Sequence, residues 1–143
     1  MGWISKLRRN QDHGAQLVEF ALLAPFLLLL LLGIIEFGFF LGEWNELKHG
    51  AHEGARIAAV NQSTDVVTST CDAINLHGNS SVTVTFTRTG SEIGDSGNVH
   101  LSANISSLSG LGMVDALLPD QVVTDADFRL EQVPTWSPTA GTC

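Results

Sequence analysis

The feature that most constrains this chain is an apolar run near its N-terminus. Residues 20–42 form a stretch of 23 residues that holds a single charged side chain, Glu36, among mostly Leu, Phe, Ile and Gly. The hydrocarbon core of a bilayer is about 30 Å thick, and roughly 20 helical residues cross it. The run therefore predicts one membrane-spanning helix over residues 20–42.

Charges on either side of this run indicate its orientation. Lys6, Arg8 and Arg9 precede it, and the next basic residue is Lys48. Basic residues that flank a span are retained on the cytoplasmic side of the membrane. We therefore expect a cytoplasmic N-terminus, with everything after Gly42 outside.

A conventional secretory signal peptide is the first alternative, and it would release a soluble enzyme or binding domain that starts beyond Gly42. Such a peptide has an apolar stretch of about 7–15 residues followed by a small-residue cleavage site. The run here is longer, and it passes into Glu43-Trp44-Asn45-Glu46 without a compelling site of that kind. Both details favour a helix that stays in the membrane.

Composition and motifs argue against several kinds of partner. Fifteen acidic residues against seven basic ones give a net charge of −8, and an acidic surface repels nucleic-acid phosphates. No Walker loop, GxSxG elbow or dinucleotide fingerprint is present. His49, His52 and Glu53 share a helix face but lack the HExxH pattern and a fourth ligand. We expect no catalytic activity, cofactor, metal site, nucleic acid or small-molecule substrate.

An acidic residue, Glu19, lies at the start of the apolar run. It follows Gly14 by five residues, and Gly14 ends a short basic leader. A carboxylate inside a bilayer costs about 2.5–3.5 kcal/mol on insertion scales, so its presence suggests a function. The alternative is that lipid head groups solvate Glu19 at the interface.

This arrangement resembles the class III prepilin signal of type IV pilins. The first 60 residues more closely resemble the TadE-like pseudopilins of the tight adherence (Tad/Flp) pilus system. The resemblance is carried by three segments, residues 14–25, 33–38 and 51–59, which read GAQLVEFALLAP, GIIEFG and AHEGARIAA.

The resemblance implies a minor pilin that takes part in assembling a pilus for surface attachment. A membrane prepilin peptidase would cut after Gly14 and leave Ala15 as the new N-terminus. The mature chain would lose three basic residues and one acidic residue, which leaves a net charge of −10. In related pilins the residue that matches Glu19 neutralises the N-terminal amine of a neighbouring subunit.

The implied location is the bacterial cytoplasmic membrane or the pilus itself, and the implied partners are the membrane, the peptidase and other pilins. The sequence leaves open whether the subunit acts at the tip, primes assembly or stays in the membrane. An uncleaved single-pass anchor that presents an extracytoplasmic binding domain remains the main alternative function.

Glycines recur along the helix that we expect over residues 15–60. Four of them fall on a four-residue register in which Glu46 takes the middle position: Gly38, Gly42, Gly50 and Gly54. In membranes the GxxxG pattern lets two helix backbones approach closely. We expect a helix-packing groove, and the alternative is that each glycine is merely tolerated.

The exported segment, residues 61–143, reads as a small α+β domain. We expect a short helix over about 65–76, strands over 82–88, 99–105 and 121–132, a helical turn near 113–117 and an irregular tail over 134–143. The predicted fold is a long membrane helix whose outer half packs on a three-stranded antiparallel sheet.

The chain has two cysteines, Cys71 and Cys143. Outside the cytoplasm they can form a disulfide that ties the tail to the short helix. The alternatives are two buried thiols or a bond between two chains.

Overall fold

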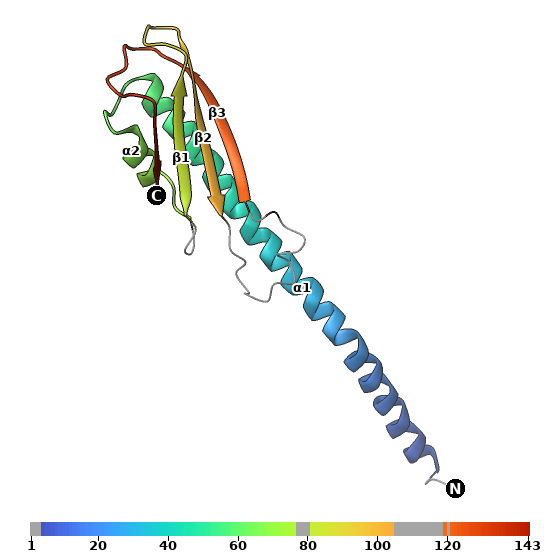
Figure 1. Ribbon diagram of the computed structural model, residues 1–143. Coiled ribbons are helices and arrows are strands. Elements are labelled where there is room, and N and C mark those ends of the chain that lie inside the picture. The colour runs from blue at the N-terminus through green and yellow to red at the C-terminus, as the bar shows by residue number, and fades with distance from the viewer. Residues whose placement is uncertain (1–3, 77–80, 105–118, 120) are drawn as a thin grey trace. The chain divides into compact units, whose positions relative to one another are not determined.

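The computed structural model describes residues 4–76, 81–104, 119 and 121–143, with side chains from residue 14 onward (Figure 1). Its helices are α1 (Ile4–Ala59) and α2 (Val66–Asp72). Its strands are β1 (Val82–Arg88), β2 (Ser96–Asn104), β3 (Gln121–Arg129) and β4 (Thr139–Thr142). The chain divides into two compact units, Met1–Phe37 and Gly38–Cys143, which we describe separately.

The first unit is the N-terminal part of α1. Within the described residues, α1 is the one helix long and apolar enough to cross a membrane. Its most apolar stretch is not buried against any part of the protein. The observed helix begins at Ile4 and so includes the described part of the leader, residues 4–14, as well as the span.

The second unit is built on an antiparallel sheet with the strand order β3-β2-β1-β4. The prediction of three strands was wrong, because β4 adds a fourth at the edge beside β1. β4 has the sequence Thr-Ala-Gly-Thr and lies in the stretch that we expected to be an irregular tail. It carries no apolar alternation, so only its backbone pairing with β1 marks it as a strand.

The alternation predicted for the first strand is confirmed by its burial. Val82, Val84 and Phe86 are buried, whereas the threonines between them face outward. The partner strand β2 begins at Ser96, three residues earlier than the predicted start at residue 99. Gly97 accounts for this difference. Glycine in a polar stretch suggests a turn, but Gly97 lies within β2, where the Phe128 ring packs against its backbone.

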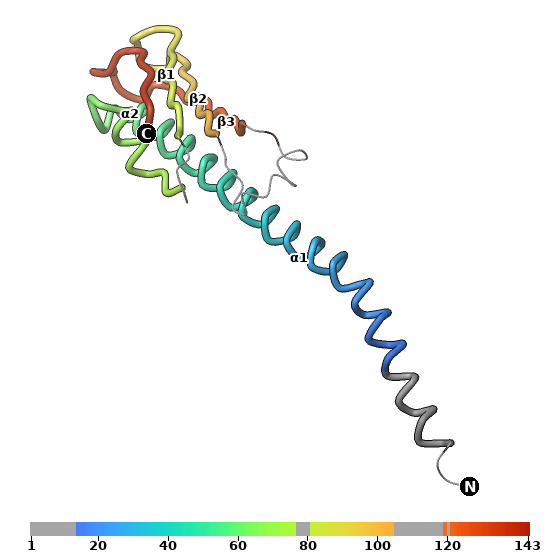
Figure 2. The backbone as a smooth tube through the Cα atoms, turned by 60° about the horizontal axis from the view of Figure 1, so that its bottom comes forward, coloured from blue at the N-terminus to red at the C-terminus, as the bar shows by residue number. Residues whose placement is uncertain are grey.

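The part of α1 that belongs to this unit lies along one face of the sheet (Figures 1 and 2). It contributes a buried stripe of Leu47, Ala51, Ala55 and Ala58, which recur every three or four residues. Small side chains let the helix backbone approach the strands. The core that results also contains Val66 and Trp136. The strands other than β4 contribute the remaining side chains: Val82, Val84, Phe86, Val99, Leu101, Ala103, Val122, Ala126 and Phe128.

α1 ends in a left-handed residue, Asn61, whose φ is 51°. The N–H of Asn61 donates to the Ala58 carbonyl, and the N–H of Gln62 donates to the Ile57 carbonyl. This is the Schellman pattern of helix termination, with Asn in the position that glycine usually takes. The helix therefore ends within a residue of the predicted end.

α2 is shorter than the predicted helix over residues 65–76. Asp65 caps its first turn by accepting a hydrogen bond from the Thr68 N–H at 3.0 Å. The helix stops at Asp72, after which the Ala73 N–H donates to the Thr70 carbonyl and the Ile74 N–H donates to the Cys71 carbonyl. The predicted helical turn near residues 113–117 lies outside the described residues.

Candidate functional site

The predicted cleavage site lies on an exposed stretch of α1. Gly14, Ala15 and Glu19 are all exposed, and a side chain at Gly14 would meet no neighbouring atom within 4 Å. Ala15 and Glu19 are four residues apart in a helix, so they lie on the same face one turn from each other. A new amine at Ala15 would therefore lie on the same face as the Glu19 carboxylate, about 6 Å closer to the N-terminus along the helix axis.

The apolar surface of α1 surrounds the helix rather than forming a stripe. Leu27 to Leu32 are six successive exposed leucines, which together point in every direction around the axis. A soluble helix buries one face and exposes polar groups on the other. The surface extends over both sides of these leucines: Leu17, Val18, Phe20, Leu22, Leu23, Phe26, Ile34, Ile35, Phe37, Phe39 and Leu41 are exposed as well.

Two acidic residues of α1 are buried, in contrast to the leucines. Glu36 is 6% exposed and Glu43 is 8% exposed. They lie seven residues apart, which places them on the same face two turns from each other. The sequence left the role of Glu36 open and grouped Glu43 with charged residues expected to meet water, so the burial of Glu43 corrects that expectation. The seven-residue spacing was a signal that could have linked the two.

The four glycines of the predicted packing groove divide into two pairs. A side chain at Gly50 would collide with Ile74, and one at Gly54 would place its β-carbon 2.7 Å from the Thr70 hydroxyl. Gly38 and Gly42 have open space where a side chain would point. A four-residue step advances a helix by about 40°, so Gly38 and Gly54 point about 160° apart. Gly50 and Gly54 therefore face the α2 region and the sheet, whereas Gly38 and Gly42 remain accessible.

Polar residues follow the apolar run on the exposed side of α1. The Lys48 ammonium lies 4.1 Å from the centre of the Trp44 ring, and Trp44 itself packs partly against the core. Farther along, Arg56 forms a bidentate pair with Glu53, with a shortest distance of 2.6 Å. Hydrogen bonding from Arg56 lowers the pKa of Glu53. Among the described residues, no three or more His, Cys, Asp or Glu side chains are grouped to hold a metal ion.

The outer face of the sheet is polar and cross-linked between β2 and β3. Asn98 donates to Asp127 at 2.8 Å, and His100 lies 2.8 Å from Asp125. Gln121 donates to the Ser102 hydroxyl at 2.6 Å. These contacts between β2 and β3 depend on strand register, which composition does not specify.

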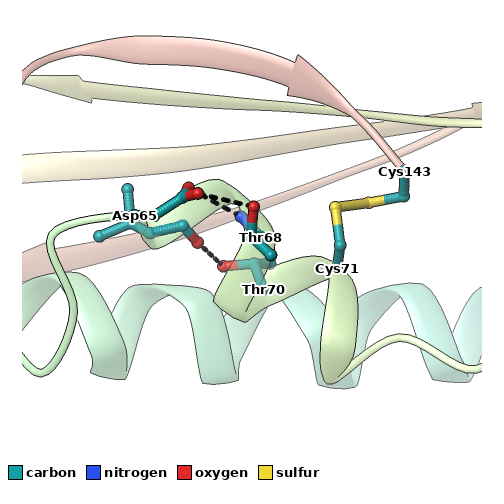
Figure 3. Close-up of a disulfide and its surroundings, with 6 residues drawn as sticks. Asp65, Thr68, Thr70, Cys71 and Cys143 are labelled. Atoms are coloured by element: carbon teal, nitrogen blue, oxygen red, sulfur yellow. Dashed lines mark hydrogen bonds between the residues drawn. A yellow bond between two sulfur atoms is a disulfide. The ribbon is translucent and has the colours of Figure 1, made fainter.

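The C-terminal tail is fastened to the helices at three points. Trp136 is 2% exposed and donates its indole N–H to the Ala58 carbonyl at 3.1 Å. The Asn61 side chain bonds to Val133 and Thr135. Cys143 is joined to Cys71 by a disulfide across a Cα separation of 5.5 Å, so the pairing favoured by the sequence is present (Figure 3).

In the part of the chain that the structure describes, these features define a protein with one helix long and apolar enough to cross a membrane and a disulfide-linked α+β unit. The sequence model of the family described as "TadE-like protein" matches residues 14–56, which are most of α1. The chain thus carries a TadE-like segment, which indicates a single-pass membrane protein associated with the Tad pilus and its other components. No curated protein and no solved structure matches the chain.

Proposed function

We propose that this protein is a minor pilin, or pseudopilin, that takes part in assembling a Tad/Flp-type pilus. It is anchored in the bacterial cytoplasmic membrane by the span over residues 20–42, with its N-terminus in the cytoplasm and residues 43–143 outside. The observation that carries this proposal is the TadE-like match, which begins at Gly14 and covers the helix whose apolar surface is exposed.

Processing after Gly14 is the first step of the proposed function. The bond between Gly14 and Ala15 is preceded by the basic residues Lys6, Arg8 and Arg9, which keep the leader on the cytoplasmic side. Glycine presents no side chain to a protease pocket. Cleavage by a prepilin peptidase would remove these cations and produce a free amine at the cytoplasmic end of the span.

Glu19 then pairs with the amine of a neighbouring subunit. Each charge alone is costly near hydrocarbon, but as a hydrogen-bonded pair the two charges offset part of each other's desolvation. Glu19 is exposed on α1 and lies at the start of the apolar run, where the helix of another subunit can reach it. The pairing selects subunits that have been cleaved, because an uncleaved chain has no amine at this level.

Gly38 and Gly42 supply the close helix contact between subunits. Both are open, so the backbone of another helix can approach them directly. Gly50 and Gly54 contact residues of their own chain and belong to the fold of the second unit. The groove available to a partner is therefore the short segment Gly38-Phe-Phe-Leu-Gly42.

The proposal is tested by the mass of the mature chain. The full-length protein, made in cells with a cognate prepilin peptidase, should lose the mass of residues 1–14. Gly14→Ala should block that loss, whereas Gly33→Ala, at another open glycine of α1, should be processed like the wild type. Intact-mass spectrometry and N-terminal sequencing provide the readout.

Two results would count against the proposal. Processing of Gly14→Ala at the wild-type rate would show that Gly14 is not recognised. A native chain that keeps its leader and does not associate with pilus components would support the uncleaved anchor with an extracytoplasmic binding domain.

A further inference from the structure

The folded core of the second unit begins very close to the end of the apolar run. The run ends at Gly42, and Leu47, the first fully buried core residue of α1, is 0% exposed. Five helical residues rise by about 7.5 Å. A bilayer measures about 40–45 Å with its head groups and about 30 Å without them, so each head-group layer is roughly 5–8 Å thick. The core therefore begins at the depth of the head groups.

The charged side chains of α1 just after Gly42 differ in how exposed they are. Glu43 is buried, and Glu46 is half-buried and accepts a hydrogen bond from the Asn75 N–H at 3.2 Å. Lys48, by contrast, is exposed. Glu43 is thus drawn into the fold and Glu46 is partly held by Asn75, so Lys48 is the most exposed charged side chain of residues 43–48.

Trp44 and Lys48 act together at this level. They lie one helical turn apart, and the ammonium lies over the face of the indole at 4.1 Å. The cation–π contact holds the lysine side chain over the ring, while the three N–H groups of its ammonium can still donate to an acceptor. Tryptophan is enriched at membrane surfaces because its ring is apolar and its N–H is polar.

We propose that Trp44 and Lys48 form a binding site for a phospholipid head group on the outer surface of the membrane. The Lys48 ammonium donates to the lipid phosphate, and the exposed part of the Trp44 ring contacts the upper acyl chains. The contact fixes the depth at which the outer end of the span lies in the bilayer. This inference rests on the proposed membrane anchoring and adds a lipid ligand to it.

The depth of Trp44 in a bilayer tests the proposal. The full-length chain with Trp3→Phe is reconstituted in phosphatidylcholine and phosphatidylglycerol vesicles whose acyl chains carry bromine either near the head group or near the chain end. Bromine quenches tryptophan fluorescence at short range. We expect shallow bromine to quench Trp44 more strongly than deep bromine, and the added substitution Trp44→Phe to abolish this quenching. Trp136 is buried in the core and contributes only a constant background.

The role of Lys48 is tested by charge reversal. Lys48→Glu should reduce shallow quenching of Trp44, and the reduction should be larger as the share of anionic phosphatidylglycerol increases, because like charges repel. Arg129→Glu provides the matched control, because Arg129 is exposed on β3 and pairs with Ser96 beside the β1–β2 turn. It should leave the quenching unchanged.

A reporter in the span separates failure of this inference from failure of the anchoring itself. Leu31→Trp in the Trp3→Phe, Trp44→Phe background should be quenched by deep bromine if the helix crosses the bilayer. Deep quenching of that reporter without shallow quenching of Trp44 would overturn the head-group site and leave the anchor intact. No quenching at either position would overturn the membrane anchoring. Unchanged quenching in Lys48→Glu would overturn the phosphate contact and favour a protein partner for Lys48.

Discussion

At the scale of single residues, Asn61 has two roles at once. Its backbone adopts the left-handed conformation that ends α1, with φ at 51°. Its side chain donates to the Val133 carbonyl at 3.2 Å and accepts from the N–H and hydroxyl of Thr135, both at 2.9 Å. Asparagine is one of the few residues that tolerates this backbone while offering both a donor and an acceptor.

Two substitutions separate these roles. Asn61→Gly keeps the left-handed backbone but removes the side-chain bonds, and should lower the free energy of unfolding by about 1–2 kcal/mol. Asn61→Ala also introduces backbone strain and should cost about 1 kcal/mol more. Urea unfolding of the full chain in detergent micelles, followed by tryptophan fluorescence, measures both values. Equal stability of the two variants would contradict the helix-capping role.

Asp65 gives a pH dependence that can be predicted in sign. Hydrogen bonds from the backbone N–H and hydroxyl of Thr68 lower its pKa. A lowered pKa in the folded state means that the stabilisation is complete above the pKa of the unfolded chain, which is about 3.9. It is lost as the pH falls through the lower, folded-state pKa.

The matched variant is Asp65→Asn, which can still cap α2 but does not titrate. The difference in unfolding free energy between wild type and Asp65→Asn should be constant near neutral pH. Below about pH 4 the wild type should lose stability relative to the variant. Urea unfolding at a series of acidic pH values measures this difference. A difference that does not change with pH would contradict the assigned shift.

At the scale of elements, packing between α1 and α2 depends on a glycine. Thr70 is fully buried, and its hydroxyl donates to the Val66 carbonyl at 2.7 Å. It therefore cannot easily move away from Gly54, against which it lies. Phe86 of β1 approaches the same position, at 3.4 Å from the site of a β-carbon. Gly54 is the place where helix, helix and strand meet most closely.

Gly54→Ala should therefore destabilise the second unit. Overpacking in a tight core costs about 1–3 kcal/mol, which exceeds the gain of about 1 kcal/mol in helix propensity. Gly42→Ala is the control, because open space lies beside Gly42 and only the propensity gain applies. Urea midpoints in micelles should fall for Gly54→Ala and hold or rise for Gly42→Ala. A urea midpoint for Gly54→Ala at or above that of Gly42→Ala would show that Thr70 moves aside to make room for the new β-carbon.

At the scale of the whole molecule, the disulfide joins two distant parts of the chain. Cys71 at the end of α2 and Cys143 after β4 are separated by 72 residues. β4 pairs with β1 over only four residues, and its Gly141 lies against Val67 of α2. The short edge strand therefore depends on the covalent link for much of its attachment.

Removal of the link with Cys71→Ser and Cys143→Ser should lower the free energy of unfolding by about 4 kcal/mol on the chain-entropy model. The wild-type chain under reducing conditions is the control and should unfold at the same urea concentration as the double variant. Identical stability of the oxidised and reduced chains would contradict the structural role of the bond.

Local patterns were sufficient for much of the fold. The apolar run of α1, the Val-Thr alternation of β1 and the start of a short helix near residue 65 each depend on neighbouring residues, and each was predicted from the sequence. β4 was missed because Thr-Ala-Gly-Thr has no local preference for a strand, and it becomes one only beside β1. Gly97 was interpreted as part of a turn for the same reason.

The candidate site shows the same division. The two cysteines were proposed as a pair from composition and expected location. The roles of Gly14 and Glu19 were implied by the resemblance to TadE-like proteins, and they stay predictions. The burial of Glu43 and the separation of the four glycines into an internal pair and an open pair could not be identified in this way. Both depend on which face of α1 the sheet covers.

The sequence by itself contained the TadE-like segment, and it predicted a helix able to cross a membrane and the orientation of that helix. Motif spacing, hydrophobic length and charge asymmetry are all properties of the linear chain. Only the tertiary structure decided that β4 joins the sheet, that Gly38 and Gly42 stay exposed, and that Glu43 is buried while Lys48 is exposed. These features arise when segments far apart in the sequence come into contact, and no local preference encodes which surfaces will meet.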